Sequence, residues 1–426
     1  MTLLDSSTRM QAEEVHARRN QVDLLRVELG MRSIRAAVCV TLMMVVATGC
    51  AAEGDKVDAP SGGEDAAGAW RRLPDASLTP RDHAVVVGVG ERMLVVGGWK
   101  FLCPPQADCA APQAPMLSDG AVYDPATDSW STISSAPFGL RRQEYAAAAL
   151  EGSAYLLTSC AAGPTCDARP RLLSYDLASD RWTDHGPVPG PKHYRHVATL
   201  DRTLLVYSGS DERGEIADLV FDPERSTWTK LPDDPLPPTF DRFIVPEGDQ
   251  LVLAGSSLSA LESGGDAPKL VARLDLAAGE WTELPNAPGQ GYQLLPSDRG
   301  PLLNGHFIES PGWILDRDTW TWSALSGHAG EHNDLSGVLD RERATYDIQN
   351  SVGQMASTNR LFVYDSRTDA FVTIPALPSR EDVYDDSNTA LGRDLFVFGG
   401  QRWIGDGLAG DGELVGDAWL WTAPAK

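Results

Sequence analysis

The sequence is poor in basic residues. Of its 426 residues, 36 are Lys or Arg and 60 are Asp or Glu, so the formal net charge is −24. Proteins that bind nucleic acid need a basic surface to neutralise phosphate groups. The composition therefore argues against a nucleic-acid partner, and we expect the acidic excess to keep the chain soluble.

Downstream of Gly68 the sequence lacks helical periodicity. Short apolar runs end there in small residues, as in LVVGG at 94–98 and LFVFGG at 395–400. Another β-rich run precedes most of them, such as HAVVVGVG at 83–90. Runs of this length, bounded by turn residues, are typical of short strands. The sequence thus predicts an all-β chain.

One phrase occurs six times in this region. In each copy an Asp follows an apolar or aromatic residue, and a Trp or Phe stands six residues after the Asp. Asp124 with Pro125, and Asp222 with Pro223, suit the first two positions of a type I turn, so the phrase predicts a hairpin. The copies are YDPATDSW at 123–130, YDLASDRW at 175–182, FDPERSTW at 221–228, LDLAAGEW at 274–281, LDRDTWTW at 315–322 and YDSRTDAF at 364–371.

Self-similarity at a period of roughly 40 to 50 residues marks a repeat architecture. Units of four short strands are typical of the blades of a β-propeller. The Gly pair after the second strand and the aromatic residue of the phrase resemble the kelch repeat, as in the central domain of galactose oxidase. The Gly pair is expected to need a positive φ, and the Trp to pack between blades. The resemblance covers Trp70 to Thr422 and implies a fold more than a function, because kelch propellers include enzymes, ligand binders and scaffolds.

Seven blades are expected, with six or eight as alternatives. Six blades carry the phrase, and the seventh runs from Asp386 to Thr422 without an outer strand of its own. AWRRLP at 69–74 is predicted to supply that strand, so that residues 70–73 pair with the C-terminal strands and close a propeller spanning 70–426. Two blades are weakly marked: PLLNGHF at 301–307 has lost the Gly pair, and ATYDIQNS at 344–351 is expected to serve as a second strand.

The segment 31–49 resembles a bacterial lipoprotein signal. It has a charged start, an apolar core at 36–46 that is too short to span a bilayer, and small residues before Cys50, although Ala47 stands where that family usually has Leu. Residues 1–30 are then expected to be an over-called extension, and residues 50–69 a flexible tether. We expect the chain to be lipid-anchored through Cys50 on the extracytoplasmic side of the cell membrane, with ordinary secretion as the alternative.

Four further cysteines form two pairs of identical spacing, Cys103 with Cys109 and Cys160 with Cys166. An exported chain meets oxidising conditions, so two local disulfides are expected. Cross-pairing between the two loops remains open. A metal site is less favoured, because no His stands at ligand spacing within either loop.

Polar residues recur in the loops that lead into the innermost strands, which in a propeller surround the mouth of the channel. Two interpretations of these residues remain open. They could satisfy backbone carbonyl groups of neighbouring blades, or the arginines could gather an anion such as a sugar carboxylate. The predicted ligand-binding residues are Arg81, His83, Arg142, Glu144, Tyr145, Arg195, His196, Arg242, His332 and Asp385.

The sequence favours a cell-surface binding or protein-interaction role, with a small acidic glycan or a protein as partner, for a monomer without a cofactor. The alternative is a carbohydrate-directed enzyme, either an isomerase resembling sialic acid mutarotases or, less favoured, a copper oxidase resembling galactose oxidase. Its catalytic residues are not identifiable. The acidic, Gly-rich segment 406–417 lacks the ligand spacing of an EF-hand and is expected to form a loop.

Replacing Cys50 tests the anchor. In Cys50→Ser the lipid acceptor is gone, so the protein should remain unprocessed or be released from the membrane. Mass spectrometry of the wild-type N-terminus should find an acylated Cys50. An unmodified N-terminus downstream of Cys50 would contradict the anchor.

Overall fold

The chain divides into two units, residues 1–63 and 64–426, and everything described below belongs to the second. The computed structural model describes residues 68–104, 109, 116–143, 145–158, 170–191, 195–262, 269–289, 291–305, 312–325, 335–339, 344–346, 361–380, 382–384, 386–404 and 411–424.

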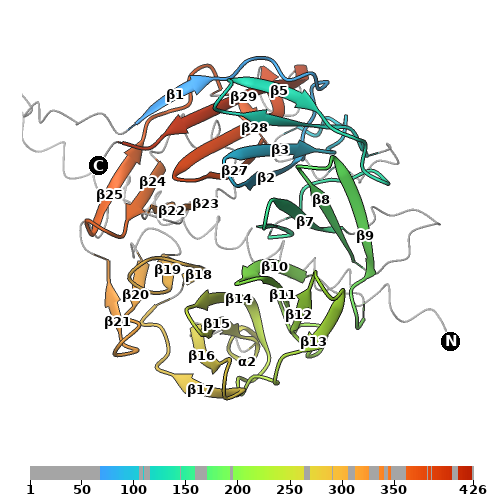
Figure 1. The fold of residues 1–426 in the computed structure, drawn as a ribbon. Helices are drawn as coiled ribbons and strands as arrows, with labels where there is room; N and C mark the ends of the chain where they lie inside the picture. Colours follow the sequence, from blue (N-terminus) through green and yellow to red (C-terminus); the bar gives the residue numbers. More distant parts are fainter. Residues whose placement is uncertain are drawn as a thin grey trace, which may run out of the picture. The chain divides into compact units, whose positions relative to one another are not determined.

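Seven sheets succeed one another along these residues and surround a common centre (Figure 1). The first four are β2 (Val85–Val89), β3 (Arg92–Val96), β4 (Gly120–Asp124) and β5 (Ser129–Thr132); β6 (Ala147–Leu150), β7 (Ser153–Thr158), β8 (Arg171–Asp176) and β9 (Arg181–Pro187); β10 (Arg195–Leu200), β11 (Thr203–Ser208), β12 (Leu219–Asp222) and β13 (Thr227–Lys230); β14 (Thr239–Glu247), β15 (Gln250–Ser257), β16 (Lys269–Asp275) and β17 (Glu280–Leu284). The short helix α2 (Leu258–Glu262) follows β15.

The remaining three sheets complete the ring. They are β18 (Gly291–Leu295), β19 (Leu302–Gly305), β20 (Gly312–Leu315) and β21 (Trp322–Ala324); β22 (Leu335–Leu339), β23 (Ala344–Tyr346), β24 (Leu361–Asp365) and β25 (Ala370–Ile374); β26 (Val383–Tyr384), β27 (Ser387–Leu391), β28 (Asp394–Ile404), β29 (Asp411–Thr422) and β1 (Ala69–Arg72). We number these sheets as blades one to seven in this order. The prediction of a seven-bladed β-propeller is confirmed.

The repeated phrase forms the outer hairpin of its blade. In blade one the Asp124 carboxylate accepts a hydrogen bond from the backbone N–H of Ala126 at 2.9 Å, which stabilises the turn. A second Asp follows four residues later: Asp128 has a φ of 49° and accepts a hydrogen bond from the Tyr123 hydroxyl at 2.6 Å. Blade two repeats this contact between Tyr175 and Asp180 at 2.8 Å.

The aromatic residue that ends each phrase joins neighbouring blades. The Trp130 indole N–H donates to the Pro74 carbonyl at 2.8 Å, and Pro74 follows the outer strand of blade seven. Equivalent bonds run from Trp70 to Pro375, from Trp182 to Ser134, from Trp281 to Pro232 and from Trp322 to Pro285. An amphipathic ring suits this position, because its body packs on apolar side chains while its N–H finds a polar partner.

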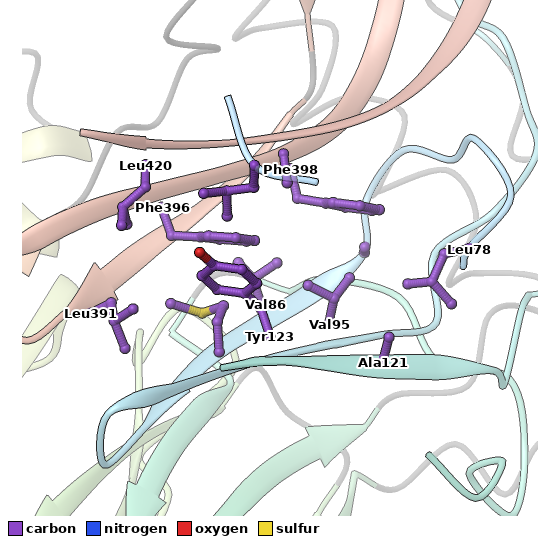
Figure 2. Close-up of a cluster of buried hydrophobic side chains, with 13 residues drawn as sticks. Leu78, Val86, Val95, Ala121, Tyr123, Leu391, Phe396, Phe398 and Leu420 are labelled. Atoms are coloured by element: carbon purple, nitrogen blue, oxygen red, sulfur yellow. The ribbon is translucent and has the colours of Figure 1, made fainter. Parts of the chain in front are cut away.

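Buried apolar side chains fill the space between consecutive blades. Figure 2 shows the cluster between blades seven and one, where Phe396 and Phe398 from β28 face Val95 and Tyr123 from blade one. The cluster contains 13 buried residues. The core is therefore divided into layers between blades.

The Gly pairs allow the backbone of a neighbouring loop to approach closely. Gly97 and Gly98 have φ values of 72° and 92°, and a Cβ on Gly97 would lie 2.4 Å from the Leu140 carbonyl oxygen. Gly399 and Gly400 repeat the conformation in blade seven, with φ values of 67° and 114°. The predicted positive φ is confirmed, and any side chain here would clash with the loop that leads into an inner strand.

Two sequence predictions were wrong in detail. Ala344–Tyr346 (β23) was expected in the second position of blade six, but it lies at the sheet edge, and β22 takes the second position, parallel to β24. The segment 406–417 was expected to be a loop, but β29 begins at Asp411 and pairs with β28 out to Ile404. The backbone continues its ladder past Gly400 because a register shift between Phe398 and Gly400 absorbs the bend.

The first described strand pairs with the last. In β1 and β29, Trp70 lies opposite Trp421 and Arg72 opposite Trp419, and the Leu73 N–H continues the ladder to the Ala418 carbonyl at 2.9 Å. Residues some 350 positions apart in the sequence thus share one sheet.

Deleting residues 70–73 should remove this strand together with the buried Leu73 and the Trp70 indole. Loss of the ladder and of the apolar contacts should lower the free energy of unfolding by about 3–5 kcal/mol. Urea denaturation of the deletion protein measures the loss, with a deletion of residues 60–63 as the control of equal length. Equal midpoints for the two deletions would contradict a role in closing the ring.

Candidate functional site

Arg81, which leads into β2, is buried within blade one. Its guanidinium forms two bonds to the Asp119 carboxylate, at 2.8 and 2.9 Å, and donates to the Gly97 carbonyl at 3.0 Å. Hydrogen bonding from Arg81 lowers the pKa of Asp119. All of these donors are used inside the blade, so the contacts favour a structural role for Arg81.

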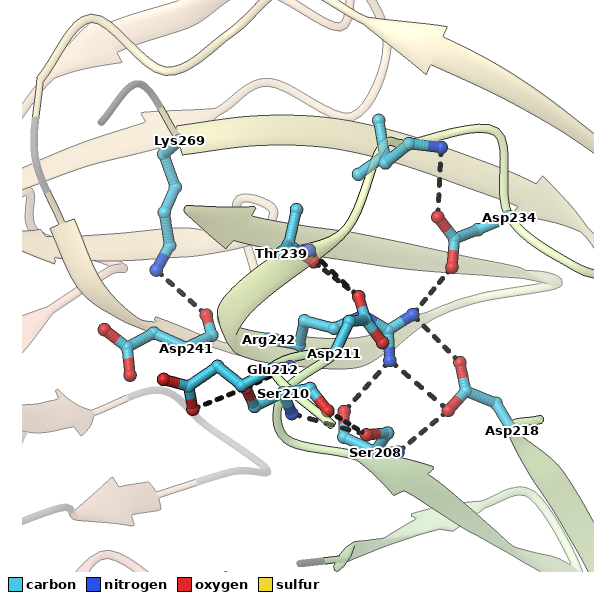
Figure 3. A network of polar contacts seen from close by, with 11 residues as sticks. Ser208, Ser210, Asp211, Glu212, Asp218, Asp234, Thr239, Asp241, Arg242 and Lys269 are labelled. Carbon is cyan, nitrogen blue, oxygen red and sulfur yellow. Dashed lines mark hydrogen bonds and ion pairs between the residues drawn. The ribbon is translucent and has the colours of Figure 1, made fainter. Parts of the chain in front are cut away.

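Arg242 is the centre of a second buried network (Figure 3). Its guanidinium lies between three carboxylates, Asp218 at 3.2 Å, Asp234 at 2.7 Å and Asp211 at 3.4 Å. It also donates to the Ser208 carbonyl at 3.0 Å, which ties blade four to blade three. Burial by itself lowers the pKa of Arg242, but the carboxylates outweigh it and raise the pKa.

Arg380, which the sequence analysis did not single out, occupies the same kind of position in blade seven. It is fully buried, pairs with Asp417 at 2.6 Å and donates to the Gly399 carbonyl. Aligning the Gly pairs of blades one and seven could have revealed it, because in each blade an Arg follows the preceding outer strand and bonds the first Gly of the pair.

Arg195 and His196 begin β10 and are also buried. Arg195 donates to the Ala217 carbonyl at 2.7 Å. The His196 ring packs against Tyr145, Tyr207 and Phe243, with centroids 4.7 to 5.4 Å apart. Burial, with the nearby Arg242 charge, lowers the pKa of His196 to about 3. His196 is therefore neutral at physiological pH and enclosed by aromatic rings.

A chain of contacts joins blades seven and one at the mouth. The Gln401 side chain from β28 accepts a hydrogen bond from the Cys103 N–H at 2.8 Å and donates to Asp82. The same Asp82 carboxylate lies 3.1 Å from Nδ1 of His83, whose ring also contacts Trp99 edge-on. His83 is thus positioned by a buried carboxylate and amide, while its own side chain stays 28% exposed.

Arg141 and Arg142, between blades one and two, are only half-buried. The Arg142 N–H donates to the His83 carbonyl at 2.7 Å, and its guanidinium donates to the Asp386 carbonyl at 3.1 Å. The Arg141 guanidinium lies over the Trp99 ring, 5.1 Å from its centroid, and its Nε is buried without a hydrogen-bond partner. Arg141 and Arg142 are consecutive in the sequence, and neither forms an ion pair with a carboxylate among the described residues.

Several predicted residues lie outside the described residues: Glu144, His332, Asp385, Cys50, Cys160 and Cys166. The predicted disulfide between Cys103 and Cys109 is confirmed. Across the described ranges, no three or more His, Cys, Asp or Glu side chains are grouped so as to hold a metal ion. Nor do those ranges contain a helix with the length and apolar character needed to cross a bilayer.

Lys269 is a further buried cation, at the start of β16. Its ammonium group donates to the Asp241 carbonyl at 2.9 Å and to the Ser256 hydroxyl at 3.2 Å (Figure 3 shows the Asp241 contact). Burial lowers the pKa of Lys269 to about 8, against the opposing effect of the Asp241 charge. The charged form is therefore disfavoured in the folded chain.

No known protein-family model matches the chain. Mouse (Mus musculus) Kelch-like protein 35 is 31% identical to it over 99 residues. The aligned segment covers 23% of this chain and 16% of the mouse protein, so the chain matches only a small part of that relative's length. Together with the seven blades, six of four strands and one of five, this similarity supports a propeller of the kelch type.

The lowered pKa of Lys269 predicts a pH-dependent stability. Below pH 8 the side chain is charged in both folded and unfolded chains, and its burial costs the folded state up to about 3 kcal/mol. The cost disappears as the pH rises from about 8 toward 10.5, because the folded chain loses the proton first.

Lys269→Met should therefore gain stability relative to wild type below pH 8 and lose that relative gain toward pH 10. Because Met also lacks the two hydrogen bonds, the test is the pH slope of the difference, measured by urea denaturation. Lys230→Met, which removes an exposed ammonium, is the control and should show no slope. A flat difference for Lys269→Met would refute the lowered pKa.

Proposed function

We propose that this chain is a binding module displayed on the outside of a cell. It recognises a small acidic glycan or a protein partner through the propeller face on which the loops into the inner strands gather. The observation that carries the proposal is that Arg141 and Arg142 on this face bond no carboxylate among the described residues, in contrast to three other arginines. Arg81, Arg242 and Arg380 are buried and bonded to carboxylates and backbone carbonyls, so they hold the ring together.

The contacts of two candidate acid–base residues, His196 and Tyr145, support binding over catalysis. A catalytic acid or base must reach its substrate and must titrate near the working pH. His196 meets neither condition, since it is enclosed by Tyr145, Tyr207 and Phe243 and its pKa is about 3. Tyr145 is held in the same aromatic cluster, so neither residue supports a mutarotase-like or oxidase-like site.

Display outside the cell is supported by two features. The signal-like segment 31–49 leads to Cys50 as a lipid acceptor, and the acyl chains would be the only membrane attachment of the proposal. The disulfide between Cys103 and Cys109 suits an oxidising compartment. The excess of acidic residues suits a monomeric domain that remains soluble while the lipid anchor holds it at the membrane.

Incubating the full-length protein with arrays of acidic and neutral glycans and peptides tests the proposal. A binding module should retain one ligand class saturably and return it chemically unchanged after prolonged incubation, as judged by mass spectrometry and NMR. Glycans modified at the anomeric carbon or oxidised during incubation would overturn the proposal in favour of an enzyme. Absence of saturable binding across both arrays would count against recognition of either class.

A further inference from the structure

Arg141 and Arg142 are half-buried, whereas four other arginines of the mouth are buried, and of these Arg195 donates to the Ala217 carbonyl. Arg81, Arg242 and Arg380 each bond a carboxylate inside the protein, at 2.8, 2.7 and 2.6 Å respectively. In contrast, among the described residues the Arg141 guanidinium contacts the face of Trp99 and bonds no carboxylate, and the Arg142 guanidinium bonds one backbone carbonyl. Both side chains therefore keep donors that a ligand could use.

The sequence of blade two accounts for the missing carboxylate. Four residues before the Tyr of the phrase, blade one has Asp119 ahead of Tyr123, and Asp119 binds Arg81. Blade two has Arg171 at that place, ahead of Tyr175. Arg171 pairs instead with Asp184 in β9, at 2.7 Å. The blade thus contains a cation at the position that supplies the internal anion in blade one.

The positions of the two side chains are set by contacts with blades one and seven. The Arg142 backbone bonds His83 of blade one, and its side chain bonds Asp386 of blade seven. The Arg141 guanidinium packs on the face of the Trp99 ring, and this cation–π contact orients the plane of the guanidinium. A guanidinium whose plane is fixed in this way can direct two N–H groups at the two oxygens of a carboxylate.

Arg141 also borders a small pocket between blades one and two. Its walls are apolar side chains that include Val85, Leu140 and Leu156, and Gln143 and Thr158 add polar groups. The pocket has room for little more than a group the size of a water molecule. It could admit one end of a ligand, while the rest of the ligand would lie over the mouth.

We infer that Arg141 and Arg142, beside His83, bind the carboxylate group of a small acidic ligand. The inference rests on the proposed binding function and names the chemistry that this face recognises. In a chain with a net charge of −24, two adjacent cations without a bonded carboxylate oppose the surrounding field and attract an anion. Partial burial reduces screening by water and strengthens a charge-assisted pair.

The experiment is isothermal titration of the full-length protein with matched acid and amide pairs. Glucuronate is compared with glucuronamide, and acetyl-glutamyl amide with acetyl-glutaminyl amide, at physiological salt. Wild type should bind at least one acid and neither amide. Binding of glucuronate alone would identify a sugar acid as the source of the carboxylate, and binding of both acids a site for the carboxylate itself.

Arg141→Gln should weaken the binding of the acid by about tenfold or more, the loss expected for a charge-assisted hydrogen bond. Arg181→Gln, an exposed position in β9 of the same blade with the same charge change, should bind like wild type. Arg141→Lys retains the charge without the planar fork. It should bind more weakly than wild type, and it provides the test if the Gln variant fails to fold.

Phenylglyoxal labelling gives a second measurement. Arg141 should react, and the bound acid should protect it, while the buried Arg81 and Arg380 should stay unlabelled in either state. Equal affinity of wild type and Arg141→Gln, or binding of the amides as strong as that of the acids, would overturn the carboxylate site. If the arrays find another ligand while both acids fail to bind, this inference is wrong and the proposed binding function stands.

Discussion

Pairing of β1 with β29 is the contact on which the ring depends. Each blade packs its apolar faces on its two neighbours, so a blade without its outer strand would expose the cores on both sides. Strand β1 and the turn after it make indole contacts with both neighbouring blades, because Trp70 bonds Pro375 of blade six and Pro74 accepts a hydrogen bond from Trp130 of blade one. The same strand lies immediately after the segment expected to be a tether, so the place where the chain leaves the propeller is set by the closing sheet.

Charge inside the propeller serves a second structural purpose. Arg81, Arg242 and Arg380 are buried, which would be costly without partners, and each is compensated by carboxylates and backbone carbonyls. These bonds connect the segment that leads into an inner strand with the end of a second strand. There the backbone carbonyl groups of a Gly pair or a Ser–Gly pair accept hydrogen bonds from the arginine. Blade two departs from this scheme. Its Arg141 and Arg142 bond no carboxylate among the described residues, and this difference leaves the site proposed for an acidic ligand.

The candidate site could be predicted only in part. The sequence placed Arg81, Arg142, Arg195 and Arg242 in loops that lead into inner strands; Arg81 and Arg142 lie in such loops, whereas Arg195 and Arg242 lie within β10 and β14. It did not separate the arginines that are bonded internally from those that are not, because the distinguishing carboxylates lie far along the chain, as Asp119 does from Arg81 and Asp218 from Arg242. It also did not single out Arg380, whose partner Asp417 lies within a segment expected to be a loop. An ion pair depends on distance in space, and a repeat pattern does not contain that distance.

The sequence by itself determined the all-β class, the seven blades, the outer hairpins and the positive φ of the Gly pairs. These features follow from local rules: turn residues at constant spacing, strand-length apolar runs and a backbone conformation that only Gly adopts readily. Tertiary structure alone decided the order of strands in blade six, the extension of β28 and β29 beyond Gly400, and the division of the mouth arginines into bonded and open ones. Each of these depends on which distant backbone or side chain comes within hydrogen-bonding distance, and that is settled only when the blades pack against one another.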